Sequence, residues 1–130
     1  MTRIITYGTF DTFHWAHMLL LQRARAMGDW LGVGLSTDAF NAIKGKQTCL
    51  PYEQRKQILS GVKYVDLIFP ENNWQQKRDD ILKYHADIFV MGDDWRGKFD
   101  DLNDICQVVY LPRTPDICST EIKKILSKTK

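Results

Sequence analysis

Short apolar runs alternate along the chain with segments whose apolar residues recur every three or four positions. The short runs are bounded by turn-forming or polar residues and predict five strands, at residues 3–7, 30–35, 64–69, 88–91 and 108–111. The other segments predict helices at residues 15–27, 51–59, 74–84 and from Ser119 onward. Several strands are apolar throughout, which is typical of parallel strands covered on both faces. The order of elements predicts an α/β fold with an open, doubly wound, five-stranded parallel sheet.

The carboxyl ends of parallel strands meet at one edge of a sheet, where doubly wound folds bind their ligands. Four predicted strands are followed by turn or polar residues, at 8–11, 37–38, 92–94 and 112–114. We expect these segments to converge although they are far apart in sequence. The chain shows no repeat or linker, so residues 1–130 are expected to form a single Rossmann-like domain with one ligand site at that edge.

The segment His14-Trp15-Ala16-His17 opens the first predicted helix. Two histidines three positions apart share one face of a helix. Free N–H groups and the helix dipole attract anions at this helix end, so the histidines favour a phosphate site. Two other interpretations remain open: ordinary surface residues, or metal ligands. Metal-binding pairs on helices are more often four apart, and no cysteine or third histidine has a useful spacing.

Basic side chains are frequent in the segments expected near this edge. They are His14, His17, Lys44, Lys46, Arg55, Lys63 and Arg113. Each alone is compatible with a solvated surface charge. The Lys44-Gly45-Lys46 loop is more distinctive, because glycine lets a backbone approach a ligand closely. Together the basic groups would meet the negative charge that develops in phosphate chemistry. Lys77 belongs to an amphipathic helix, and the pattern alone predicts a solvated face for it.

Other polar residues near the strand ends have two interpretations each. Asp11, Asp38 and Asp94 would bind ribose hydroxyls or a metal, or only cap turns. Arg113-Thr114 is a second candidate phosphate site, whereas capping explains Ser119-Thr120 at a helix start. The sequence contains no Walker loop, no Gly-x-Gly-x-x-Gly fingerprint and no serine nucleophile elbow. The commonest nucleotide-binding and hydrolase motifs are therefore excluded.

Composition and charge narrow the class of protein. A chain of 130 residues with 44% apolar and 26% charged residues is typical of a globular domain. Its net charge of +2 argues against a general nucleic-acid binder, which would be far more basic. Three cysteines without a C-x-x-C pair indicate free thiols in a reducing compartment. Neither a signal peptide nor an apolar run near the ~20 residues of a membrane span is visible, so we expect a cytoplasmic protein.

Several motifs resemble one family of enzymes. The turn Gly8-Thr9-Phe10-Asp11, followed by His14-x-x-His17, resembles the signature of the cytidylyltransferase family of nucleotidyltransferases, which share a His-x-Gly-His motif. The resemblance covers nearly the whole chain. Its other motifs are Ser36-Thr37-Asp38, Tyr52-Glu53 with Arg55-Lys56, Tyr64-Val65-Asp66, Met91-Gly92-Asp93-Asp94-Trp95 with Gly97-Lys98-Phe99, and Val108-Val109-Tyr110-Leu111-Pro112-Arg113-Thr114-Pro115.

The resemblance implies transfer of CMP from CTP to glycerol 3-phosphate, which gives CDP-glycerol and pyrophosphate. The acceptor phosphate would attack the α-phosphorus of CTP directly, without a covalent enzyme intermediate. Mg²⁺ is implied as a cofactor carried by the CTP phosphates, with no metal site formed by the protein itself. The resemblance also implies a homodimer and a product used for teichoic-acid or capsule-type polymers.

Residues of this sequence that match the family motifs receive roles from the resemblance. His14, His17, Lys46 and Arg55 would be catalytic, with the histidines stabilising the transition state. The nucleotide would be bound by Thr9, Phe10, Asp11, His14, His17, Lys46, Asp94, Arg113, Thr114, Ile117, Cys118, Ser119 and Thr120. The acceptor would be bound by Lys44, Lys77, Asp38 and Lys63.

Three features depart from the family pattern. Ala16 replaces a glycine, and its methyl group would crowd the nucleotide, although a helical backbone tolerates alanine. Residues 113–120 lack a usual glycine and are one residue shorter, with Cys118 where a serine would align. Lys63 replaces an arginine, which keeps the charge but loses a bidentate fork. Two alternatives stay open: another polyol or amine phosphate as acceptor, or a nucleotide-binding module whose catalysis has decayed.

Overall fold

The computed structural model describes residues 1–112. Within this range the strands are β1 (Arg3–Gly8), β2 (Trp30–Ser36), β3 (Leu67–Glu71), β4 (Ile88–Gly92) and β5 (Gln107–Leu111). They form one sheet in the order β3-β2-β1-β4-β5, and every neighbouring pair is parallel. The predicted five-stranded, doubly wound parallel sheet is confirmed.

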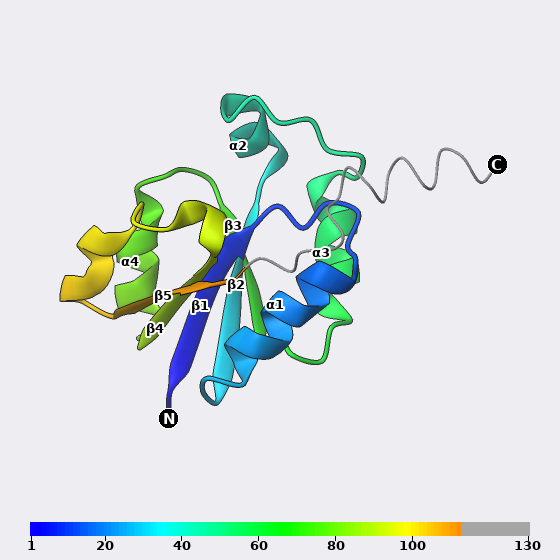
Figure 1. Ribbon diagram of the computed structural model, residues 1–130. Helices are drawn as coiled ribbons and strands as arrows, with labels where there is room; N and C mark the ends of the chain where they lie inside the picture. Colours follow the sequence, from blue (N-terminus) through cyan, green and yellow to red (C-terminus); the bar gives the residue numbers. More distant parts are fainter. Residues whose placement is uncertain (113–130) are drawn as a thin grey trace.

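Helices cover both faces of this sheet. They are α1 (Trp15–Arg25), α2 (Asp38–Ile43), α3 (Tyr52–Ser60) and α4 (Gln76–Lys83), with the 3-10 helices η1 (Asp93–Trp95) and η2 (Asp100–Asp104). Figure 1 shows α1 and α3 on one side of the sheet and α4 on the other. The short helix α2 stands beyond the carboxyl end of β2, outside the two helix layers that cover the faces of the sheet (Figure 1).

Each face of the sheet has its own hydrophobic core, because consecutive side chains of a strand point to opposite faces. Ile4 of β1 belongs to one cluster, together with Leu21 of α1 and Leu59 of α3. Ile5, the next residue, belongs to the other cluster with Ile81 of α4. A strand buried on both faces needs apolar residues at nearly every position, which explains the continuous apolar runs in the sequence.

The strand order reverses at β1. The chain proceeds from β1 to β2 and β3 on one side, and then places β4 and β5 on the other. The Thr6 hydroxyl joins the two halves by donating a hydrogen bond to the Val90 carbonyl at 2.6 Å. A crevice opens beyond the carboxyl ends of the strands at such a reversal. The turn after β1 and the helix η1 after β4 are the segments nearest to it.

The third strand is shifted from its predicted position. Residues 64–66 follow α3 as a turn, in which the Val65 N–H donates to the Val62 carbonyl, and the strand extends to Glu71. Pro70 lies inside the strand rather than ending it. This is tolerated because β3 is an edge strand, which has hydrogen-bonding demands on one side only. The shift places Glu71 at the carboxyl end of the strand.

The helices also differ in part from the prediction. α2 has only six residues, too few for a periodic pattern, and is capped by Thr37, whose hydroxyl accepts from the Phe40 N–H. α4 begins at Gln76, after a turn in which Asn73 accepts the Gln76 N–H at 2.8 Å. The helix predicted from Ser119 lies outside the described residues. No helix within residues 1–112 is long and apolar enough to cross a membrane.

Candidate active site

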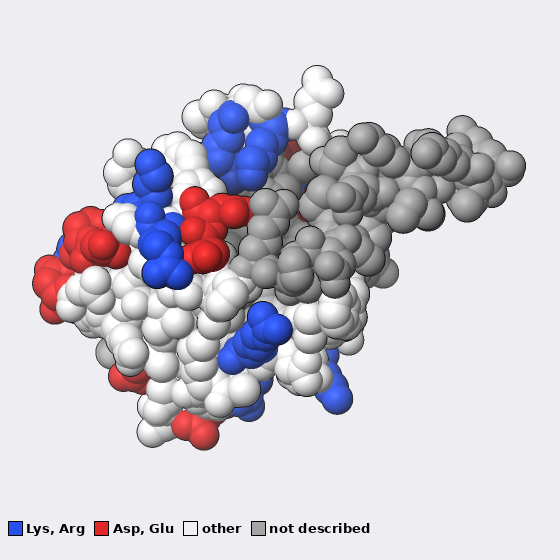
Figure 2. Space-filling model, viewed as in Figure 1, with Lys and Arg blue, Asp and Glu red and all other residues white. Residues whose placement is uncertain are grey.

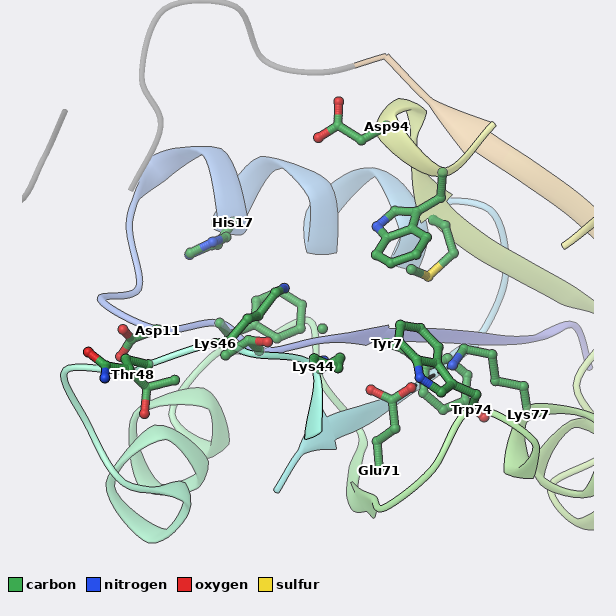
Figure 3. A pocket seen from close by; sticks show the side chains of 16 residues that line it. Tyr7, Asp11, His17, Lys44, Lys46, Thr48, Glu71, Trp74, Lys77 and Asp94 are labelled. Carbon is green, nitrogen blue, oxygen red and sulfur yellow. Dashed lines mark hydrogen bonds and ion pairs between the residues drawn. The ribbon is translucent and has the colours of Figure 1, made fainter. Parts of the chain in front are cut away.

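A cavity of about 600 Å³ lies at the carboxyl edge of the sheet. Its walls come from the turn after β1, the loop after α2, the end of β3, the segment around the start of α4, and the end of β4 with η1. Figure 3 shows His17 and Lys46 toward one end, and Glu71, Trp74 and Lys77 toward the other. The predicted convergence is therefore confirmed for residues 8–11 and 92–94, both of which contribute to the wall.

The turn after β1 has a strained backbone. Phe10 and Thr12 have φ angles of 49° and 45°, a region that residues with a side chain rarely adopt. The Phe10 ring is buried, and a Cβ atom added at Gly8 would lie 2.7 Å from it. Glycine at position 8 thus leaves room for the ring. Strain of this kind persists only where packing enforces it, and it is frequent at functional sites.

His14 and His17 cap the amino end of α1 with their own side chains. His14 is the N-cap residue, and its Nδ1 accepts the Ala16 N–H at 3.2 Å. The Nδ1 of His17 accepts the His14 N–H at 3.3 Å, which completes a capping box built from imidazoles. Because each Nδ1 accepts, the neutral rings carry their proton on Nε2, which becomes a donor. Ala16 lies within the helix, where alanine fits the backbone.

The two imidazole rings are neutral near pH 7. They are stacked, with centroids 4.0 Å apart and planes inclined by 24°. Burial, with a smaller contribution from His14, lowers the pKa of His17 to about 4, although Asp11 acts in the opposite direction. Burial also lowers the pKa of His14 below its ordinary value. The rings are therefore polarised N–H donors rather than positive charges; His17 lines the cavity, whereas His14 is not among the described residues of its wall.

A hydrogen-bonded chain of four side chains occupies the other end of the cavity. The Lys44 Nζ donates to the Ser36 hydroxyl at 2.7 Å, and that hydroxyl donates to Glu71 Oε1 at 3.2 Å. The Lys77 Nζ donates to Glu71 Oε2 at 2.6 Å. The solvated position predicted for Lys77 from the pattern is wrong. Its side chain is almost fully buried, because α4 turns it toward the cavity and Glu71 supplies the counter-charge that a buried ammonium needs.

Lys44, the first residue of this hydrogen-bonded series, lies at the carboxyl end of α2 and is half-buried. Burial lowers the pKa of Lys44 to about 8, and the nearby cations Lys46, Lys77 and Arg55 act in the same direction, against the effect of Glu71. The site thus has an ammonium that is mostly protonated at neutral pH and loses its proton in the mildly alkaline range.

Aromatic rings form much of the wall around the two lysines. The Lys77 Nζ lies 4.8 Å from the Tyr7 ring centre and 5.2 Å from that of Trp74. The Lys44 Nζ lies 5.8 Å from the Trp74 ring. These distances are within the range of cation–π attraction. Sequence reasoning missed Glu71, Trp74 and Tyr7 as site residues. The one available signal was their position near strand ends, which the misplaced third strand concealed for Glu71.

Arg55 is buried beneath the site and does not line the cavity. Its guanidinium donates to three carbonyl oxygens, those of Thr9 at 3.0 Å, Ser36 at 2.7 Å and Leu50 at 3.0 Å. A fourth hydrogen bond, of 2.8 Å, joins it to the Asp38 carboxylate. Arg55 therefore fixes the turn after β1, the end of β2 and the loop before α3 relative to one another. It acts on the site by positioning backbone.

The predicted aspartates have different surroundings. Asp11 lines the cavity, and its carboxylate accepts the N–H groups of Cys49 and Leu50. Asp38 lies outside the wall and accepts the Tyr52 N–H, which lowers the pKa of its carboxyl group together with the Arg55 hydrogen bond. Both aspartates thus hold the loop between α2 and α3. Asp94, at the start of η1, lines the cavity.

The remaining predicted site residues differ in whether they line the cavity. Thr9, Phe10 and Lys46 line the cavity. Lys63 does not, and its ammonium lies 5.2 Å from the Tyr64 ring. The remaining nucleotide-binding predictions lie outside the described residues, and they are Arg113, Thr114, Ile117, Cys118, Ser119 and Thr120.

Basic and acidic side chains are distributed unevenly on the visible face. Figure 2 shows basic side chains over α2 at the top of the molecule and acidic side chains over η2 at the left, with further side chains of both signs between them. The basic region adjoins the loop that carries Lys44 and Lys46 into the cavity wall. Within residues 1–112, no group of three or more His, Cys, Asp and Glu side chains is arranged to hold a metal ion. The cavity is thus suited to an anionic ligand such as a phosphate.

Comparison with known proteins gives concordant matches. The family model described as cytidylyltransferase-like matches residues 5–125. A glycerol-3-phosphate cytidylyltransferase of Bacillus subtilis is 56% identical over 95% of this chain and 96% of its own length. One of the same name from Staphylococcus aureus is 56% identical over 97% of this chain and 96% of its own length.

The fold has solved counterparts as well. A lipopolysaccharide core biosynthesis protein of Thermoplasma volcanium superposes with a TM-score of 0.73 at 22% identity, over 87% of this chain and 98% of that one. At this identity the likeness concerns the fold alone. The family match and the two relatives confirm the resemblance seen in the sequence motifs: the chain belongs to the cytidylyltransferase-like family.

Proposed function

We propose that this protein is a glycerol-3-phosphate cytidylyltransferase, which transfers CMP from CTP to glycerol 3-phosphate and releases pyrophosphate. The observation that carries the proposal is the 56% identity to proteins of that name over nearly the whole chain. The cavity supports it, because the His17 ring and the ammonium groups of Lys44, Lys46 and Lys77 line one continuous space at the strand ends. Such a space accommodates two phosphorylated substrates at once.

The two ends of the cavity take different substrates in this proposal. The CTP triphosphate lies at the amino end of α1, against His17 and Lys46, and the acceptor phosphate lies between Lys44 and Lys77. An oxygen of the acceptor phosphate attacks the α-phosphorus of CTP. The bond from that phosphorus to the oxygen bridging it to the β-phosphorus breaks, and pyrophosphate leaves with the electron pair. The protein contributes positioning and charge stabilisation, with no covalent intermediate.

The neutral histidines stabilise the transition state as donors. Their Nδ1 atoms are occupied by backbone N–H groups, so the Nε2–H bonds are fixed in direction before the substrate arrives. Donors aimed in advance at developing charge are worth roughly 10²- to 10³-fold in turnover each. Lys46 adds a positive charge on the same phosphates.

Mg²⁺ fits this site as a companion of the nucleotide. Among the described residues, three carboxylates line the cavity, those of Asp11, Glu71 and Asp94, but no group of three or more His, Cys, Asp and Glu side chains is arranged to hold an ion. Triphosphate oxygens are the usual partners of Mg²⁺, which keeps few protein ligands. When bound, the ion neutralises charge on the leaving pyrophosphate.

The test is pyrophosphate release with CTP and a panel of acceptors: glycerol 3-phosphate, a longer polyol phosphate and an amino-alcohol phosphate. We expect glycerol 3-phosphate to give the highest kcat/KM. Preference for another acceptor would assign the same chemistry to a different substrate. CTP binding by calorimetry without release with any acceptor would identify a nucleotide-binding module without catalysis.

The proposal extends to the setting of the reaction. The enzyme acts as a homodimer in the cytoplasm, and its product supplies glycerol phosphate units for teichoic-acid or capsule-type polymers. The family resemblance supports the homodimer and the use of the product, and the three cysteines without a C-x-x-C pair support a reducing compartment. Light scattering coupled to gel filtration measures the oligomeric state, and a monomeric mass at assay concentration would contradict the dimer.

A further inference from the structure

Glu71 places a carboxylate at the end of the cavity assigned to the acceptor. Figure 3 shows it between Lys44 and Lys77, beneath the Trp74 ring. Its two oxygens are held separately, one by the Ser36 hydroxyl at 3.2 Å and one by the Lys77 ammonium at 2.6 Å. Only 3% of Glu71 and 3% of Lys77 is exposed, although both residues line the cavity. The orientation of the carboxylate is therefore fixed.

The charges at this end of the cavity nearly balance. Lys77 and Glu71 form an ion pair, and Lys44 is linked to them only through the neutral hydroxyl of Ser36. Two ammonium groups and one carboxylate leave a local charge of +1. One phosphate group is attracted to this charge, but a second anionic group on the same molecule would meet the carboxylate. Because Glu71 and Lys77 are almost fully buried, water screens that repulsion only weakly.

We propose that Glu71 is a specificity-determining residue, which restricts the acceptor to phosphates of uncharged polyols by repelling a second anionic group. The inference rests on the proposed function, because it concerns the acceptor of that reaction. The carboxylate acts in two ways. It opposes a substrate anion directly, and it occupies the Lys77 ammonium, which would otherwise pair with such an anion.

Glycerate 3-phosphate is a suitable probe. It differs from glycerol 3-phosphate by a carboxylate in place of the terminal CH₂OH group, so the two acceptors are close in size. We expect the wild-type protein to have a kcat/KM for glycerate 3-phosphate at least ~10-fold below that for glycerol 3-phosphate. Glu71→Gln keeps the shape and hydrogen-bonding capacity of the side chain and removes its charge. In this variant we expect the ratio of kcat/KM for glycerol 3-phosphate to kcat/KM for glycerate 3-phosphate, the acceptor ratio, to fall by about 10-fold or more, with an unchanged KM for CTP.

Two control variants separate this effect from others. Glu71→Asp keeps the carboxylate, so the acceptor ratio should remain within about 3-fold of the wild-type value even if turnover falls. Asp104→Asn removes an exposed carboxylate, paired with Arg78 on the surface, and changes the net charge by the same amount as Glu71→Gln. We expect it to leave the ratio unchanged.

The pH profile gives a second readout that a merely structural role would not move. Lys44 is faced by Lys46, Lys77 and Arg55, which lower its pKa, and by Glu71, which raises it. Without the carboxylate, Lys44 should lose its proton at lower pH. The alkaline fall in kcat/KM for glycerol 3-phosphate should therefore move to lower pH in Glu71→Gln, but not in Asp104→Asn.

The outcomes distinguish the inference from the function on which it rests. If the wild type releases pyrophosphate with glycerol 3-phosphate and Glu71→Gln has an unchanged acceptor ratio, the inference alone is overturned. Equal use of both acceptors by the wild type overturns it without any variant, so poor folding of Glu71→Gln would not protect it. Absence of release with glycerol 3-phosphate would contradict the proposed function and this inference together.

Discussion

Lys44 is the residue whose chemistry depends most directly on its surroundings. Burial lowers the pKa of Lys44 to about 8, so its charge is present at neutral pH and is lost as the pH rises through that value. We expect kcat/KM for glycerol 3-phosphate to fall above about pH 8, because the acceptor phosphate then loses a cationic partner. Lys44→Arg keeps its charge throughout and should lack this alkaline fall. An unchanged alkaline fall in Lys44→Arg would assign it to another group.

Single residues also mark the limit of sequence reasoning. The sequence of an amphipathic helix does not show whether a lysine on it is solvated or buried. Lys77 is buried because its ammonium group pairs with Glu71, which lies on a different element. The pairing depends on the exact end of β3. By contrast, the loop position of Lys44 and Lys46 was enough to expect them near the strand ends, and both line the cavity.

The side chains that cap the amino end of α1 are also the ones to which the proposed mechanism gives a catalytic role. His14→Ala removes both the imidazole and the cap, whereas His14→Asn removes the imidazole but keeps an acceptor suited to an N-cap. We expect both variants to lose roughly 10²-fold in turnover. Only His14→Ala should also lose about 1 kcal/mol of unfolding free energy. Turnover and urea unfolding of the two variants check this, and near-normal turnover in His14→Asn would contradict the donor role.

The segment from β2 to α3 depends on one buried guanidinium. Arg55 joins three backbone carbonyls and Asp38, and Arg55→Met would leave those acceptors without a donor. We expect a loss of about 3–5 kcal/mol in unfolding free energy, because each of the three carbonyl groups left without its donor costs about 1–3 kcal/mol. Arg55→Lys should restore only part of it, since one ammonium cannot reproduce the planar fork. Denaturant unfolding measures both variants, and a loss below about 1 kcal/mol in Arg55→Met would contradict the positioning role.

A helix or strand could be predicted from the sequence where its buried apolar residues recur at a regular spacing. The strands covered on both faces and the helix α1 are long enough to show such a spacing. β3 was placed too early, because Tyr64 and Val65 pack against the core from a turn and resemble strand residues in their composition. α2 is too short to show a period and depends on its Thr37 cap.

The whole molecule determines which residues meet. Reversal of strand order at β1 brings the turn after β1, the end of β3 and η1 to one cavity, and the alternation of strands and helices was sufficient to predict that edge. The pattern did not contain the sequence-distant contacts that complete the site, such as those of Arg55 and Glu71. These contacts depend on distances between layers, which periodicity does not specify.

The binding of nucleotide and metal ion is a property of the assembled molecule and gives the last prediction. Since the described residues hold no cluster of three metal ligands, Mg²⁺ should enter with CTP. EDTA should abolish pyrophosphate release yet leave the Tm of the free protein unchanged. CTP with Mg²⁺ at a hundredfold excess over its Kd should stabilise the fold by about 2.7 kcal/mol, and this gain should shrink when Mg²⁺ is removed. Calorimetric scans with and without each ligand make the comparison. A lower Tm of the nucleotide-free protein in EDTA would instead indicate a metal ion that is bound to the protein itself.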